Sequence, residues 1–319
     1  MKAIQIDQYG GEDLLKQVDV PQPKAGKNQV LVRVVATTFN PIDAKRTSGN
    51  MRQIMPVQFP FIPGQDFSGV VDSVGEGVKD FKAGDEVYGF SPNGGAYAEY
   101  LAIDADKVAL KPKKLNHIDA ASLGLVAQTA FEMVNRANVQ KGQTVLIQGA
   151  GGSVGSVAVQ EAHRRGAVVI ATATGPSLDR LRKYGADRVI DYQTERFEDY
   201  ARNVDAVLDA VGGDVQLRSF SVLKPGGVLV AISQPPSEEE AKKHQVKASM
   251  FSTEANGENL KKIAELVDAG EIRPYVGKTY PLADVANAWR DARSNKVDGK
   301  LVLLVAAEAG ARSQRATAS

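Results

Sequence analysis

The chain has 319 residues, and its 39 lysines and arginines nearly balance its 38 aspartates and glutamates. This balance gives no sign of a nucleic-acid or membrane surface, and we expect neither a membrane span nor a signal peptide. Cysteine is absent, which excludes disulfides, thiolate zinc sites and cysteine nucleophiles. We therefore expect a cytoplasmic protein of about two domains.

Residues 1–119 contain short β-rich runs separated by prolines and glycines, which is typical of a compact, mainly β domain. The clearest of these runs are 30–39, 67–75, 85–90 and 96–103. Residues 120–135 have apolar side chains at helical spacing, which predicts a helix.

From residue 143 onward, apolar strands alternate with helices, which predicts a parallel sheet covered on both faces. The expected strands are 144–148, 168–174, 188–192, 206–211 and 226–233, and the expected helices are 153–166 and 178–185. Near residue 257 the alternation ends, and the helices 259–270 and 283–294 and the strand 299–305 are expected to rejoin the first domain. The prediction is one domain of residues 1–119 and 257–319, a second of residues 120–256, and a disordered tail over 306–319.

A glycine-rich turn, "QGAGGSVG" (148–155), lies between an expected strand and an expected helix. Gly149, Gly152 and Gly155 would permit a sharp turn, a close approach of a phosphate to the backbone, and tight packing of helix on strand. The amides and dipole of the new helix would then face a pyrophosphate. With these flanks, the turn indicates a dinucleotide site, although a turn that merely needs glycine is the alternative.

The second strand of this unit bears on which dinucleotide binds. NAD-specific sites place a carboxylate about 20 residues past the glycines, on the ribose 2′-hydroxyl. Here Ala173 takes that position, Thr174 and Ser177 follow, and Arg180 lies on the next helix. Hydroxyls and cations accept a 2′-phosphate that a carboxylate would repel, which favours NADP. Arg182 and Lys183 are expected to belong to a solvated helix face.

Several segments together resemble the zinc-free medium-chain reductases, the quinone oxidoreductase or zeta-crystallin-like group. The resemblance spans about residues 1–305 and is carried by 40–43 (NPID), 60–71, 81–90, 94–100, 141–160, 209–213, 223–227 and 299–304. It implies an α/β fold in which a GroES-like β domain joins a Rossmann domain with a doubly wound parallel sheet, and NADPH lies between them. The family usually has a further glycine where this chain has Ser153, and His163 is a second departure.

The resemblance also suggests residues that contact the cofactor. The segment at Gln128 and Thr129 faces the nicotinamide in relatives, Tyr192 follows the third strand, and Lys300 resembles a lysine that reaches the cofactor. The complete predicted cofactor set is Gln128, Thr129, Gly149, Gly152, Ser153, Val154, Gly155, Thr174, Ser177, Tyr192, Ser233, Phe251 and Lys300.

No metal is expected. Gln65 stands where zinc-dependent relatives carry a histidine, and the three histidines, His117, His163 and His244, lie far apart in the sequence. Without zinc to polarise a carbonyl, hydride transfer to a quinone or to the β-carbon of an enone or enal is favoured, because charge then spreads to an oxygen that one or two donors can stabilise.

Candidate catalytic residues follow from the family motif at 40–43: Asn40 and Asp43 are expected at the cleft floor, and Lys45 as a donor to the developing enolate. A surface position for Lys45, a ribose contact for Lys45, and a turn or helix-start role for Asp43 remain alternatives. The connection 49–63 either lines a substrate mouth with Met51, Ile54, Met55 and Phe59 or covers the core.

The substrate stays open among quinones, enals, enones and enoyl thioesters, and the expected partners are a small-molecule substrate and a second copy of the chain. The competing functions are a non-catalytic NADPH-binding structural or sensor protein and a zinc-free alcohol dehydrogenase.

Overall fold

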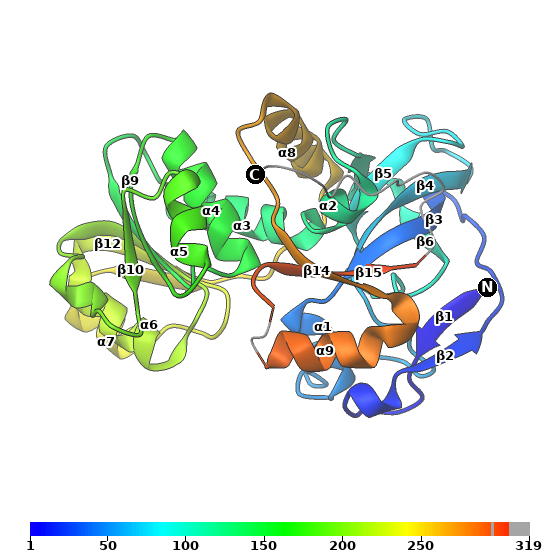
Figure 1. The fold of residues 1–319 in the computed structure, drawn as a ribbon, viewed down its shortest axis with the longest axis horizontal. Coiled ribbons are helices and arrows are strands. Elements are labelled where there is room, and N and C mark those ends of the chain that lie inside the picture. The colour runs from blue at the N-terminus through cyan, green and yellow to red at the C-terminus, as the bar shows by residue number, and fades with distance from the viewer. Residues whose placement is uncertain (295–296, 306–319) are drawn as a thin grey trace, which may run out of the picture.

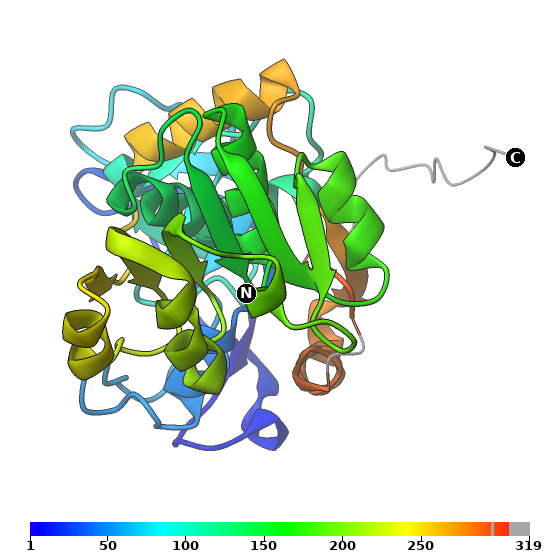
Figure 2. The ribbon, with the colours of Figure 1, turned by 90° about the vertical axis from the view of Figure 1, so that its left-hand side faces the viewer.

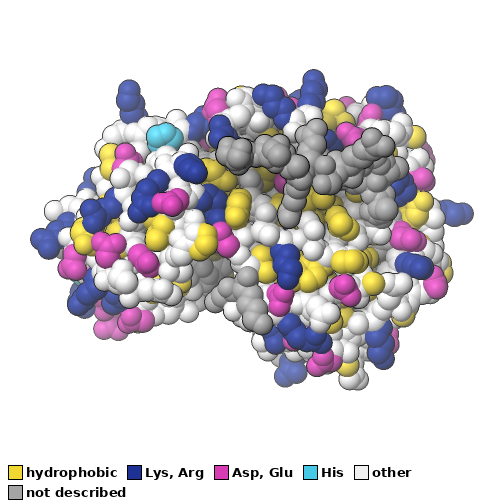
Figure 3. Space-filling model, viewed as in Figure 1, with side chains coloured by type: hydrophobic (Ala, Val, Ile, Leu, Met, Phe, Trp, Pro, Cys, Tyr) yellow, Lys and Arg dark blue, Asp and Glu magenta, His cyan; other side chains and the backbone are white. Residues whose placement is uncertain are grey.

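A computed structural model describes residues 1–294 and 297–305 of the chain, so the predicted tail at 306–319 lies outside the described residues. The molecule has two lobes, each built on its own sheet (Figure 1). Basic and acidic side chains intermingle over the face shown in Figure 3, in keeping with the balanced composition.

The first lobe contains a mostly antiparallel sheet in the order β14-β15-β3-β4-β5-β7, with β6 paired to β3, and a separate β1-β2 hairpin. Its long central strands carry the valine-rich runs whose side chains fill a core beneath the sheet. The strands are β1 (Lys2–Gln5), β2 (Lys16–Asp19), β3 (Gln29–Thr38), β4 (Asp66–Val74), β5 (Glu86–Phe90), β6 (Tyr100–Asp104), β7 (Val108–Leu110), β14 (Val276–Pro281) and β15 (Lys300–Leu304).

The second lobe contains a parallel sheet in the order β10-β9-β8-β11-β12-β13 (Figure 2). Alternate side chains of each strand enter two different cores: Val145 and Ile147 join one, and Leu146 joins the other. Both faces are therefore buried, as apolar parallel strands require. The strands are β8 (Thr144–Gln148), β9 (Val168–Ala173), β10 (Arg188–Asp191), β11 (Val204–Asp209), β12 (Leu223–Ala231) and β13 (Lys247–Met250).

Helices cover both sheets. They are α1 (Pro41–Thr47), α2 (His117–Ala121), α3 (Gly124–Arg136), α4 (Ser153–Arg164), α5 (Ser177–Lys183), α6 (Gly213–Ser219), α7 (Glu238–Lys243), α8 (Gly257–Ala269) and α9 (Val285–Arg293). Short 3₁₀ helices lie at η1 (Glu12–Leu14), η2 (Ala105–Lys107), η3 (Phe197–Asp199), η4 (Phe220–Val222) and η5 (Leu282–Asp284).

The expected fold class is confirmed: a GroES-like β domain is combined with a Rossmann-type parallel sheet. The segment after residue 257 does return to the first lobe, because β15 pairs with β3. The domain boundaries between residues 119 and 120 and between residues 256 and 257 stay a prediction. Within the described residues, the elements that the sequence did not predict are α1, α6, α7, β1, β2, β7, β13 and β14.

The helix expected over 120–135 is confirmed from Gly124 onward as α3, but its expected first residues belong to the end of α2 and to a two-residue break at 122–123. The start of α3 is packed closely against β4 and β5, since a Cβ at Gly124 would lie 2.4 Å from Gly89 O and 2.7 Å from Asp66 Oδ1. The break brings the first turn of α3 against the start of β4.

Candidate active site

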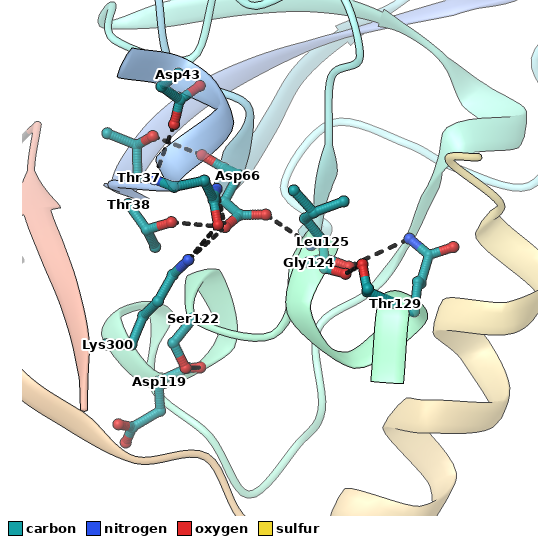
Figure 4. Close-up of polar contacts among 12 residues, drawn as sticks. Thr37, Thr38, Asp43, Asp66, Asp119, Ser122, Gly124, Leu125, Thr129 and Lys300 are labelled. Atoms are coloured by element: carbon teal, nitrogen blue, oxygen red, sulfur yellow. Dashed lines mark hydrogen bonds and ion pairs between the residues drawn. The ribbon is translucent and has the colours of Figure 1, made fainter. Parts of the chain in front are cut away.

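A buried carboxylate, Asp66, is the centre of a polar network between the two lobes (Figure 4). Its Oδ2 accepts hydrogen bonds from Thr38 Oγ1 at 2.6 Å and Asn40 Nδ2 at 2.8 Å, and its Oδ1 accepts one from Leu125 N at 2.6 Å. The Lys300 ammonium lies 3.4 Å from Asp66 Oδ2 and donates to Asn40 Oδ1. The negative charge is therefore held by one cation and three donors.

Strand pairing explains why these residues meet. β3 pairs with β4 on one side and β15 on the other, with Thr37 opposite Phe67 and Thr38 opposite Val302. The end of β3 and the starts of β4 and β15 therefore lie together. Helix α3 has no side-chain cap at its N-terminus, and the Asp66 carboxylate accepts from its first turn instead.

Asp43 lies beside this network, buried in α1. Its Oδ2 accepts a hydrogen bond of 2.9 Å from Asn40 N, which is the helix-start role that the sequence left open. Burial raises the pKa of the Asp43 carboxyl to about 7, opposed by the bond from Asn40 and reinforced by the nearby charge of Asp66. A second member of α1, Arg46, donates to Pro92 O at 2.6 Å and lies over the Phe61 ring.

Lys45 is exposed on α1, and within the described residues no hydrogen bond or ion pair of its side chain is observed. Of the three predicted catalytic residues, the structure thus places Asn40 in the Asp66 network, Asp43 next to it, and Lys45 outside it. The connection 49–63 is open to solvent at its middle, where Ile54 is 79% exposed. Nearer its end, the Phe59 ring packs edge-on against Tyr9, with ring centroids 4.9 Å apart.

The glycine turn has the geometry of a phosphate cradle. Gly149 has a φ of +72°, and a Cβ at Gly155 would lie 2.4 Å from Gly149 O, so the turn and the helix approach closely. Helix α4 begins at Ser153 without a side-chain cap, so the amides of Ser153 and Val154 are directed to the space before the helix. These features fit a pyrophosphate.

A slot of about 10 Å³ lies where the start of α4 faces the start of β15. Ser153 lines it from α4, Lys300 from β15, and Ser122 from the segment between α2 and α3. The predicted cofactor residues Ser153 and Lys300 are thus brought together, although they lie far apart in the sequence.

The end of β9 lies against the same turn. Ala173 is 2% exposed, and Ser177 Oγ donates to Thr174 O at 2.6 Å. A Cβ on Gly151 would lie 2.8 Å from Ser177 Oγ, so this hydroxyl packs behind the glycines. Tyr192 is 60% exposed, and its amide bonds to Ala173 O. Thr174 and Tyr192 therefore lie on a rim at the end of β9, and Ser177 is buried beneath this rim.

Helix α3 contributes the other predicted cofactor side chains. Thr129 Oγ1 donates to Leu125 O at 2.8 Å and lies 2.7 Å from the hydroxyl of Thr253. Both amide groups of the Gln128 side chain already have protein partners: its Nε2 donates to Gly124 O, and its Oε1 accepts from Asn256 N at 3.0 Å.

The two remaining predicted cofactor residues follow β12 and β13. Ser233 Oγ donates to Ala210 O at 2.8 Å, and the Phe251 ring lies under the Arg136 guanidinium. Sequence reasoning missed Asp66, Thr38 and Thr253 as members of the site. A charged residue directly before the apolar run at 67–71 was the available signal for Asp66.

Among the residues that the structure describes, no group of three or more His, Cys, Asp or Glu is placed to hold a metal ion. Gln65 is buried and donates to Pro92 O at 3.2 Å. His117 lies between Ser68 and Glu86, and His244 beside Glu240. The zinc-free character of the chain stays a prediction.

No helix in the described ranges is long and apolar enough to cross a bilayer.

The chain matches two protein families. Residues 26–113 match the alcohol dehydrogenase GroES-like domain, and residues 184–303 match the zinc-binding dehydrogenase family. The NADPH-dependent alkenal/one oxidoreductase of Arabidopsis thaliana, a chloroplastic protein, is 36% identical over 95% of this chain and 79% of its own length.

Two solved structures are similar throughout. The quinone oxidoreductase from Coxiella burnetii has a TM-score of 0.88 and 35% identity, covering 96% of this chain and 99% of its own. Mycobacterial Rv1454c complexed with NADPH has a TM-score of 0.87 and 30% identity, covering 96% and 100%. The prediction of NADP as the cofactor is confirmed by the NADPH-dependent relative and by the similar structure that is complexed with NADPH. The chain therefore belongs to the quinone oxidoreductase group of the medium-chain dehydrogenase/reductase family and is an oxidoreductase.

Proposed function

We propose that this chain uses NADPH to reduce a small conjugated enal, enone or quinone, without zinc. The observation that carries the proposal is that Ser153, directly after the glycine turn, and Lys300, a member of the Asp66 network, line the same small slot. The names of the alkenal/one oxidoreductase and of the quinone oxidoreductase support both substrate classes.

The glycine turn and the first amides of α4 would hold the pyrophosphate, and the rim formed by Thr174 and Tyr192, with Ser177 beneath it, would hold the adenosine ribose. Ala173 supplies no carboxylate there, which favours the phosphorylated cofactor. Thr129 would face the nicotinamide. Gln128, Ser233 and Phe251 would shape that side through the contacts they already make.

When bound, NADPH supplies a hydride. The protein must orient the acceptor, exclude bulk water and stabilise the charge that develops on the substrate oxygen. Lys45 is our candidate donor to that oxygen, because its ammonium is exposed on α1 and has no partner among the described side chains. Asn40 and Asp43 would form the floor, and the buried Lys300–Asp66 pair would keep that floor rigid. A water molecule would deliver the final proton.

We propose a zinc-independent reaction because the side chains available at the relevant position are poor zinc ligands. The position that carries a histidine in zinc-dependent relatives holds Gln65, whose amide donates to Pro92 O. An amide is a poor zinc ligand compared with imidazole or thiolate, and the chain has no thiolate to offer. We further propose a homodimer and a cytoplasmic location, while the Arabidopsis relative is named chloroplastic.

Steady-state oxidation of NADPH tests the proposal, with trans-2-hexenal, 1-octen-3-one and 9,10-phenanthrenequinone as acceptors. Hexanal is the matched chemical control, because it has the aldehyde without the conjugated double bond. We expect saturable turnover of at least one conjugated acceptor, no turnover of hexanal, and unchanged rates after dialysis against a chelator.

NADPH binding without turnover of any acceptor would instead favour the non-catalytic binding protein. Turnover of an alcohol with NADP would favour an alcohol dehydrogenase. A rate that is lost on chelation and restored by zinc would contradict the zinc-independent mechanism.

A further inference from the structure

Arg180 of α5 reaches out of the cofactor-binding lobe and contacts the other lobe. Its Nη1 and Nη2 donate to the two carboxylate oxygens of Asp298 at 2.5 and 2.8 Å, forming a forked ion pair. Its guanidinium lies over the ring of Tyr275, 3.9 Å from the centroid. Asp298 and Tyr275 flank β14 and β15 of the first lobe.

The same guanidinium also contacts the glycine turn. Arg180 Nη2 donates to Gly151 O at 3.1 Å, so one side chain links the turn, α5 and the segment before β15. Its side chain is only 9% exposed, which shields the ion pair from solvent. Arg182, two residues later on the same helix, is 55% exposed and pairs with Asp179 within α5 rather than with the other lobe.

Both lobes that Arg180 joins carry parts of the site. Asp298 is two residues before Lys300, whose ammonium belongs to the Asp66 network. Tyr275 lines the same slot as Ser153 and Lys300. A second link lies nearby, where the Gln160 amide of α4 bonds to both backbone groups of Arg273, at 2.8 and 3.1 Å.

We propose that Arg180 is a positioning residue that locks the glycine turn to the strand carrying Lys300 and so keeps the two lobes closed on the pyrophosphate. The inference rests on the proposed function only in placing the cofactor at the glycine turn. Arg180 is not a contact of the ribose 2′-phosphate, because both of its Nη groups are committed to Asp298 and Gly151. The apparent affinity for a dinucleotide is the affinity of the closed state multiplied by the fraction of molecules that are closed. Loss of the lock lowers this fraction, so it weakens the binding of NADPH and NADH alike.

The test measures the dissociation constants of NADPH and NADH by fluorescence titration for Arg180→Met, Asp298→Asn and the double variant. We expect each single variant to weaken both dinucleotides about tenfold, equivalent to about 1.4 kcal/mol. The double variant should bind no more weakly than Arg180→Met, because removing Arg180 already removes its ion pair with Asp298. Arg180→Lys keeps the charge but not the fork, so it should not restore the affinity.

Arg182→Met is the matched control, and its constants should stay within about twofold of the parent values. Asp298→Asn is the milder change, since the Asp298 side chain is 29% exposed, compared with 9% for Arg180. Urea unfolding of each variant checks that the fold persists. If Arg180→Met weakens NADPH and leaves NADH unchanged, Arg180 contacts the 2′-phosphate and the inference is wrong. Additive effects in the double variant, or unchanged affinities in the singles, overturn it as well. Because these are binding measurements, they stand whether or not any acceptor turns over.

Discussion

The Lys300 ammonium lies 3.4 Å from the Asp66 carboxylate, with exposed side-chain fractions of 6% and 0%. This pair joins β15 to β4 across β3 and fixes the floor of the candidate active site. Breaking such a pair leaves one buried charge without its partner, which costs more than the pair itself contributes.

Lys300→Met should therefore lower the free energy of unfolding by about 2–4 kcal/mol, measured by urea denaturation without cofactor. This loss is at the lower end of what breaking a buried ion pair costs, because Thr38, Asn40 and Leu125 still donate hydrogen bonds to Asp66. Lys224→Met is the matched control: the Lys224 side chain is 46% exposed and pairs with Asp205, so the loss should stay below about 1 kcal/mol. Equal losses in the two variants would contradict a special role of the buried pair.

The Asp43 carboxyl should make stability depend on pH. Its folded pKa is raised to about 7 by burial, against an unfolded value of about 4, so between these values the folded chain holds a proton that the unfolded chain has released. The contribution of this proton to stability is complete below pH about 4 and is lost as the pH rises to about 7.

Asp43→Asn keeps an oxygen acceptor for Asn40 N and cannot ionise. Relative to the parent, the variant should therefore gain stability from pH 5 to pH 8, by about 1–3 kcal/mol, in urea denaturation at both pH values. Asp72→Asn, at an exposed position, should show no such trend. A stability difference between Asp43→Asn and the parent that is the same at both pH values would refute the titration of Asp43.

Cofactor preference should follow the uncharged position at the end of β9. We expect NADPH to bind at least about tenfold tighter than NADH, or about 1.4 kcal/mol, in fluorescence titrations. Ala173→Asp should reverse or abolish this preference, because a carboxylate there repels a 2′-phosphate and accepts from a ribose hydroxyl.

Ala173→Asn separates charge from size at this crowded place, where a Cβ on Gly151 would be 3.5 Å from Ala173 Cβ. It should weaken both dinucleotides to a similar degree. If Asn and Asp have the same effect, packing rather than charge determines the preference.

Lys45 tests the proposed chemistry. If its ammonium stabilises the enolate, Lys45→Met should lower kcat and kcat/KM together by roughly 10- to 100-fold with a conjugated acceptor, and leave NADPH affinity unchanged. Lys79→Met, another exposed lysine, is the control and should stay within about twofold. Weaker NADPH binding with normal kcat at saturation would point to a ribose contact, and no change in either constant to a surface residue.

The sequence alone determined the two-part architecture and the place of the glycine turn. Both depend on local patterns: alternating apolar strands and helices, and glycines between a strand and a helix. Such patterns are visible along the chain because neighbouring residues produce them. Thus β8, β9, α4 and α5 lie close to where periodicity placed them.

The tertiary structure alone decided which distant side chains meet. Asp66, Asn40 and Lys300 come from three separate segments, which the pairing of β3 with β4 and β15 brings into contact, and the packing of α3 against β4 adds Leu125. In the same way, the sequence placed Arg180 beside a ribose phosphate, whereas the fold pairs it with Asp298, 118 positions later. Burial is the physical reason: a charge removed from water must find a partner wherever the packed chain provides one.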